Sequence, residues 1–103
     1  MKQISNYNEL ISILNDTDGK VFLKISTETC GPCRAMAPTI AELEKAHQDV
    51  TFIECNAEEC DEDILAKFNV RNVPVIIVLN DGKVQDQTVG LQTKDALEER
   101  LSK

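Results

Sequence analysis

Two cysteines separated by two residues, Cys30 and Cys33, are the feature of this sequence best suited to chemistry. They follow an apolar, strand-like stretch, residues 21–25, and precede a segment whose apolar residues have helical spacing. The free N–H groups and the dipole at a helix N-terminus favour a thiolate, which is the nucleophile of thiol–disulfide exchange. We therefore expect Cys30, the outermost thiol, to attack a substrate disulfide. Cys33, one helical turn further in, then resolves the mixed disulfide.

The two residues between the cysteines suit the same chemistry. Pro32 falls in the first helical turn, where the N–H that proline lacks has no partner within the helix. Gly31 has no side chain and leaves room for a partner chain to approach. We therefore assign Gly31 and Pro32 to the candidate site together with the two cysteines.

A zinc site is the main alternative for these cysteines. Cys55 and Cys60 would complete it, but their spacing is Cys-x4-Cys, and 21 residues separate them from Cys33. Zinc ribbons use Cys-x2-Cys twice with a shorter gap. Redox chemistry is therefore the favoured interpretation, without metal or cofactor, while zinc and a plain structural pair stay open. For Cys55 and Cys60 themselves, ordinary buried thiols and a regulatory disulfide both stay open.

The length of 103 residues predicts one domain over residues 1–103. The chain has 18 acidic and 11 basic residues, which gives a net charge of −7. This charge argues against binding to nucleic acid or to an anionic membrane surface. The longest apolar run, residues 73–79, is far shorter than a membrane span. The N-terminal residues have no apolar region typical of a signal peptide, so we expect a cytoplasmic protein, and a monomer.

Helices and strands are expected to alternate along most of the chain. Patterns predict helices through residues 7–14, after Cys33 through residue 47, from an acidic stretch at 58–63 through 68, and from 93 through 101. Strands are predicted over 21–25, 50–55, 73–79 and 84–89, with a hairpin turn at Asp81-Gly82. This order predicts an α/β sandwich with a mixed sheet.

At this point the sequence resembles the thioredoxin family over nearly its whole length. The resemblance rests on short motifs: Cys30-Gly31-Pro32-Cys33-Arg34, Pro38, Val73-Pro74, Asp81-Gly82 and Gly90. It implies the thioredoxin fold, a central mixed β-sheet flanked by four helices. It also implies dithiol reductase activity on protein disulfides and recharging by a thioredoxin reductase. Finally, it implies that Pro74 is cis beside the cysteines, that the backbone of Val73 pairs with the substrate chain, and that Gly90 lies on the same surface.

The sequence departs from the family pattern around the cysteines. Ser26 and Thr29 stand at two positions where the family has Trp, and the chain contains no Trp. Lys24 stands where the family has a buried Asp, and Glu54 where many bacterial members have a Lys. We therefore expect Lys24 and Glu54 to form the same ion pair with its charges exchanged, within about 4 Å and beneath the cysteines. The alternative is that Lys24 extends to solvent and Glu54 lies on the surface.

The sequence is compatible with three functions. The first is a protein-disulfide reductase, the second a disulfide oxidase or isomerase of the same fold, and the third a non-catalytic interaction module. The Gly-Pro between the cysteines resembles the reducing members, because oxidases and isomerases commonly carry a His there. Arg34 either favours the thiolate, meets a partner, or is a plain surface residue. The reductase is the prediction.

Overall fold

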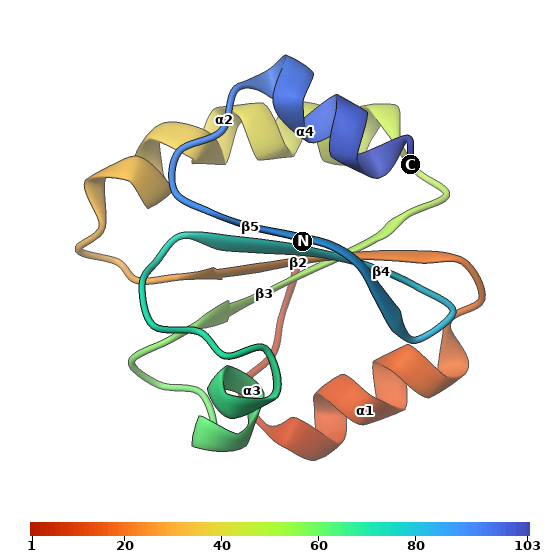
Figure 1. Ribbon diagram of the computed structural model, residues 1–103, viewed down its shortest axis with the longest axis vertical. Helices are drawn as coiled ribbons and strands as arrows, with labels where there is room; N and C mark the ends of the chain where they lie inside the picture. The colour runs from red at the N-terminus through yellow and green to blue at the C-terminus, as the bar shows by residue number, and fades with distance from the viewer.

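The computed structural model describes residues 1–103 and has a five-stranded sheet between two pairs of helices (Figure 1). The elements in chain order are β1 (Lys2–Gln3), α1 (Tyr7–Asp16), β2 (Lys20–Ser26), α2 (Gly31–Ala46), β3 (Thr51–Asn56), α3 (Glu62–Lys67), β4 (Val75–Asn80), β5 (Lys83–Val89) and α4 (Lys94–Leu101). The strand order is β1-β3-β2-β4-β5. The first three strands of that order run parallel, and β4 and β5 are antiparallel to their neighbours. The mixed sheet and the four helices expected from the sequence are confirmed.

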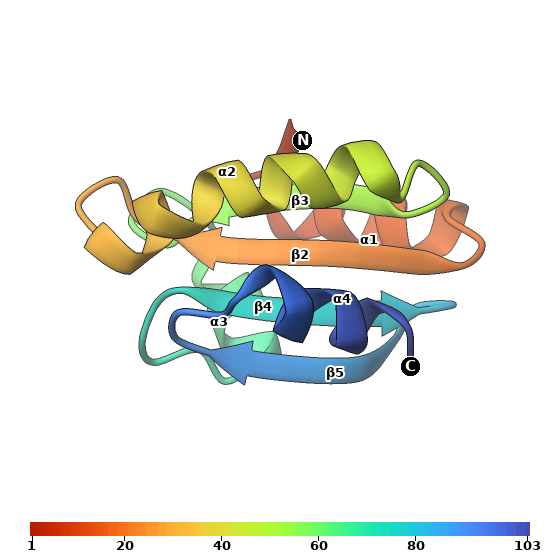
Figure 2. The same ribbon diagram turned by 90° about the horizontal axis from the view of Figure 1, so that it is seen from above.

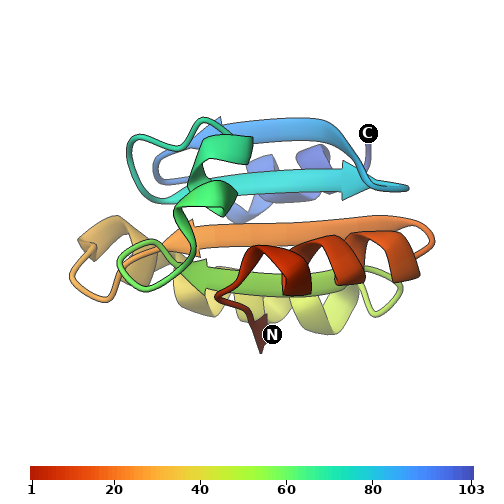
Figure 3. The ribbon, with the colours of Figure 1, turned by 90° about the horizontal axis from the view of Figure 1, so that it is seen from below.

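Each face of the sheet packs against its own pair of helices. Helices α2 and α4 lie over one face and α1 and α3 over the other, as Figures 2 and 3 show from opposite sides. Successive strand residues point to opposite faces, so β2 divides its apolar side chains between two cores. Val21, Leu23 and Ile25 enter the core under α1 and α3. Phe22 enters the core under α2 and α4.

Local sequence signals set several of the boundaries. Asn6 caps α1, since its side chain accepts a hydrogen bond of 2.7 Å from the N–H of Glu9. Thr93 caps α4 in the same way, at 3.1 Å from the N–H of Ala96. In the hairpin between β4 and β5, Asp81 and Gly82 both have positive φ, 52° and 81°. A tight turn that needs positive φ at two successive residues explains the Asp-Gly pair.

Two elements differ from the sequence expectation. Helix α3 begins at Glu62 rather than at the start of the acidic stretch, because residues 57–59 form a turn. The carboxylate of Asp61 does not cap α3 and instead accepts a hydrogen bond of 2.7 Å from the N–H of Tyr7. Strand β1 was not foreseen, since two residues are too few for an alternating pattern. It pairs beside β3 and brings Gln3 opposite Glu54.

Candidate active site

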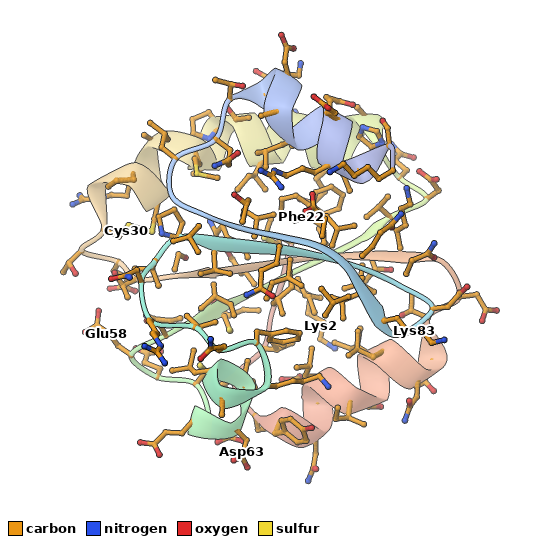
Figure 4. All side chains as sticks on the ribbon, viewed as in Figure 1. Lys2, Phe22, Cys30, Glu58, Asp63 and Lys83 are labelled. Carbon is orange, nitrogen blue, oxygen red and sulfur yellow. A yellow bond between two sulfur atoms is a disulfide. The ribbon has the colours of Figure 1, made fainter.

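Cys30 and Cys33 form a disulfide where α2 begins, with their Cα atoms 5.2 Å apart. Figure 4 labels Cys30 at this end of the helix. Cys33 is buried, with 3% of its surface exposed, while Cys30 is only half-buried. The pair therefore has an accessible sulfur and a sheltered one.

The local backbone explains this arrangement. Cys30 is the N-cap residue of α2, and its sulfur accepts a hydrogen bond of 3.1 Å from the N–H of Cys33. Pro32 lies in the first helical turn, where its missing N–H costs nothing. A side chain at Gly31 would meet nothing within 4 Å, so this residue faces open space. Once the disulfide opens, the N–H groups and the dipole at this helix end stabilise negative charge on Cys30.

Two further loops reach the same end of the sheet. In β4, Val75 is opposite both Ile25 of β2 and Val89 of β5, so the loops next to these three residues are neighbours. The Val73–Pro74 peptide bond is cis, which confirms the expectation for Pro74. Gly90 has a φ of 97°, a conformation that side chains disfavour, and its N–H donates to the carbonyl of Pro74 at 2.8 Å.

Lys24 and Glu54 form the ion pair expected from the sequence. The residues are direct neighbours on the parallel strands β2 and β3, and the ammonium lies 3.3 Å from a carboxylate oxygen. Lys24 is the only charged residue in the core, with 8% of its surface exposed, whereas 30% of the Glu54 side chain is exposed. The pair is therefore desolvated mainly on the lysine side.

A cavity of about 240 Å³ joins this ion pair to the inner cysteine. Its walls include Lys24, Ser26, Cys33, Arg34, Glu54 and Asn56. The expectation that the ion pair lies beneath the cysteines is confirmed to the extent that Lys24, Glu54 and Cys33 share this cavity. Sequence reasoning missed the cavity itself, whose wall includes Ser26, a residue at a Trp position of the family pattern. It also missed Gln3 and Asn56, since Gln3 reaches the cavity on the unforeseen strand β1.

Cys55 and Cys60 are free thiols, and of the two only Cys55 also lines the cavity. Cys55 is buried in the core under α1 and α3, and Cys60 packs against that core. Burial, reinforced by the neighbouring Cys60, raises the pKa of the Cys55 thiol to about 12. Burial also raises the pKa of Cys60. A raised pKa keeps both thiols protonated near neutral pH, so both are poor nucleophiles there.

Comparison with known proteins agrees with this geometry. The thioredoxin family model matches residues 2–103. The chain belongs to the thioredoxin family. It is 33% identical over 101 residues to a thioredoxin of Mycoplasmoides gallisepticum, covering 98% of this chain and 99% of that one. It is 31% identical over 88 residues to a thioredoxin of Bacillus subtilis, covering 84% of each chain.

The solved structures lead to the same family. The X-ray structure of Fasciola hepatica thioredoxin superposes with a TM-score of 0.91 at 26% identity, covering 99% of this chain and 97% of that one. Members of the thioredoxin family are protein-disulfide oxidoreductases, and this chain has its cysteine pair at disulfide distance. The protein is a thioredoxin-type reductase of protein disulfides, as the sequence predicted. No helix in the structure is both long enough and apolar enough to cross a membrane.

Proposed function

We propose that Cys30 is the nucleophile and Cys33 the resolving thiol of the reductase cycle. The Cys30 thiolate attacks one sulfur of a substrate disulfide, forms a mixed disulfide and releases the other substrate sulfur as a thiolate. Cys33 then attacks the Cys30 sulfur, closes the Cys30–Cys33 disulfide and releases the second substrate thiolate. The observation that carries this proposal is that Cys30, the more exposed thiol, caps α2 and accepts the N–H of Cys33.

We propose that Val73, Pro74 and Gly90 form the surface on which a substrate chain docks. Neither the N–H nor the carbonyl of Val73 makes a backbone hydrogen bond, because β4 begins only at Val75. Val73 as a residue is half-buried, and its two backbone groups need partners, which an extended substrate segment supplies. The hydrogen bond from Gly90 to Pro74 holds the two loops together beside that segment.

We propose that Lys24, Glu54 and Arg34 tune the inner cysteine. All three line the cavity that Cys33 also lines. The two cations favour the thiolate of Cys33 during the resolving step, and the Glu54 carboxylate is the acceptor available for its proton. All three act on the charge and the proton of Cys33, so their substitution shifts the pH dependence of turnover rather than removing the reaction.

The partners proposed are proteins with accessible disulfides and a flavin-type thioredoxin reductase that returns the disulfide to the dithiol. We propose that residues 1–103 act as one domain and as a monomer. The cytoplasmic location expected from the N-terminal residues stays a prediction, which cell fractionation tests.

Reduction of insulin by the dithiol form tests the proposed roles. Cys30→Ser should abolish turnover, and peptide mapping of an alkylated, reduced sample should find Cys30 labelled first near neutral pH. Faster labelling of Cys33 or Cys55 would overturn the assignment. A measured reduction potential distinguishes the reductase from the oxidase or isomerase alternative, because a strongly oxidising disulfide would favour the latter.

A further inference from the structure

The cavity beside Cys33 lies on the flank of the disulfide away from the proposed docking surface. Its walls come from β1, β2, β3, α2 and the loop before α2, and none come from β4, β5 or the loops at Val73 and Gly90. Cys33 and the free thiol Cys55 line the cavity, and Cys30 does not. A molecule in the cavity therefore meets the inner cysteine, whereas a protein substrate meets the outer one.

The size and polarity of the cavity suit a small polar molecule. Its volume of about 240 Å³ is many times the roughly 10–15 Å³ that one water needs. A Trp at position 26, as in the family pattern, would add a bulky side chain to this wall, whereas Ser26 leaves the space open. Ser26, one of the sequence departures around the cysteines, is thus part of the cavity wall.

Charges of both signs line the cavity. Lys24 and Arg34 supply two cations, and Glu28 and Glu54 supply two carboxylates. Lys24 is the most informative of these, because its side chain is only 10% exposed and its ammonium pairs with a single carboxylate, that of Glu54. An ammonium has three donors, so one that lines a cavity can bind a carboxylate of a bound molecule in addition to its protein partner. Glu28 and Glu54 complement an ammonium group on the same molecule.

We propose that this cavity binds a low-molecular-weight thiol that carries both an ammonium and a carboxylate group, an amino-acid thiol, and directs its sulfur to Cys33. The inference deepens the proposed function and rests on it, because it uses the same Cys30–Cys33 disulfide. The bound thiolate attacks the Cys33 sulfur, a new sulfur–sulfur bond forms, the Cys30–Cys33 bond breaks, and Cys30 leaves as a thiolate. A second molecule of the thiol attacks the sulfur of the first and releases a small disulfide and the Cys33 thiolate.

Attack on Cys33 has the better leaving group of the two possible directions. The sulfur that departs is Cys30, which caps α2 and accepts the N–H of Cys33 at 3.1 Å. A thiol whose anion is stabilised leaves faster in disulfide exchange. The cavity thus gives small thiols a route to recharge the protein that bypasses the protein-docking surface.

The experiment measures how fast small thiols open the Cys30–Cys33 disulfide of the oxidised full chain. L-cysteine is compared with uncharged 2-mercaptoethanol at equal thiolate concentration, and new protein thiols are counted by quenched alkylation. Each result is expressed as the rate with L-cysteine divided by the rate with 2-mercaptoethanol. A substitution that alters the reactivity of the disulfide toward both thiols equally leaves this ratio unchanged. Removing the cavity charges with Lys24→Met plus Glu54→Met should lower this ratio by about fivefold, the scale of a partly exposed ion pair.

The chain offers a matched control. Lys94 and Glu42 form another Lys–Glu salt bridge of 3.0 Å, exposed between α4 and α2. Lys94→Met plus Glu42→Met removes the same charges and should leave the ratio unchanged. Ser26→Trp, which restores the family residue and fills the cavity, should lower the ratio as well, and it decides the matter if the double apolar variant does not fold.

A second measurement locates the attack. In a Cys30→Ser variant the Cys33 thiol should react with L-cystine and give an adduct on Cys33 by peptide mapping, and Ser26→Trp in that background should suppress the adduct. A ratio unaffected by the cavity variants, or no adduct on Cys33, would overturn the inference. Insulin reduction by the wild-type dithiol distinguishes failure of the cavity proposal from failure of the proposed function. If insulin reduction proceeds and depends on Cys30 while the rate ratio is the same in the wild type and the cavity variants, only the cavity proposal fails.

Discussion

The chain carries two pairs of cysteines close in sequence, and their surroundings are opposite. Cys30 and Cys33 lie at the start of a helix, joined in a disulfide next to a charged cavity. Cys55 and Cys60 lie at the end of a strand and in the turn before a helix, as free thiols against an apolar core, although Cys55 also touches the same cavity. The chemistry of a thiol therefore follows from the backbone and charges around it rather than from the presence of a second thiol nearby.

Two physical differences separate the pairs. At Cys30 the helix N-terminus directs an N–H at the sulfur, which favours the thiolate. At Cys55 burial removes water without providing a cation, and the neighbouring Cys60 adds to the effect, so the pKa rises to about 12. The helix end thus favours exchange at the first pair, as proposed above, and burial disfavours it at the second.

The largest expected effect separates the pairs by activity. Cys30→Ser should abolish reduction of insulin, because no mixed disulfide forms without the nucleophile. Cys55→Ser combined with Cys60→Ala should keep turnover within about twofold of the wild type, since neither thiol is activated. Initial rates with matched protein concentrations check both. Large loss in the Cys55/Cys60 variant with an intact fold would break the comparison.

The next effect distinguishes the members of the first pair. Cys33→Ser should accumulate mixed disulfides with substrate proteins, because the attack that resolves them is missing. Capture from a lysate followed by peptide mapping should place every adduct on Cys30. The same capture with Cys30→Ser plus Cys33→Ser is the control, and adducts that persist there would assign the reaction to Cys55 or Cys60.

A smaller effect concerns the charges that make the first site different. Glu54→Gln should lower the free energy of unfolding by about 1–3 kcal/mol, between the cost of breaking a buried pair and that of breaking an exposed one, because Glu54 is 30% exposed. Lys24→Met plus Glu54→Met should cost less than Glu54→Gln alone, since no unpaired charge remains. Urea unfolding of the three proteins checks the order. A double variant less stable than the single one would contradict the ion-pair argument.

The sequence predicted the elements whose signals are local. The Asp81-Gly82 turn and the Thr93 cap lie where the residue types require them. Lys24 and Glu54 were also predicted as partners, because they stand where the family has a buried Asp and a Lys, and because a charge in an apolar strand needs a partner. The roles of the site residues stay predictions for the experiments above.

Features that depend on the three-dimensional arrangement were beyond the sequence. The acidic stretch before Glu62 has the composition of a helix start, yet Asp61 bonds to the N–H of Tyr7, a residue distant in the chain. The cavity beside Cys33 is walled by residues of strands β1, β2 and β3 and of helix α2, which are distant from one another in the chain. Neither spacing nor composition encodes such a meeting point.

The smallest expected effect tests the suppressed pair through pH. The pKa of Cys55 rises from 9.0 to about 12 in the folded protein, so the native state holds this proton more tightly than the unfolded state does. Its contribution to stability is complete below about pH 9 and is lost progressively as the pH rises toward 12, by at most about 1.4 kcal/mol per pH unit and less where water screens the thiolate.

In the oxidised protein Cys30 and Cys33 carry no thiol, so they do not add to the signal. Lysines titrate in the same range, and for that reason the measured quantity is the difference between wild type and Cys55→Val. Urea unfolding is measured at pH 8, 9 and 10, around the ordinary thiol pKa of 9.0. The free energy of unfolding of the wild type should fall more steeply with pH than that of Cys55→Val. Parallel pH profiles would mean that the Cys55 thiol is no more suppressed than an exposed one, and the contrast between the two pairs would then rest on Cys30 and Cys33 alone.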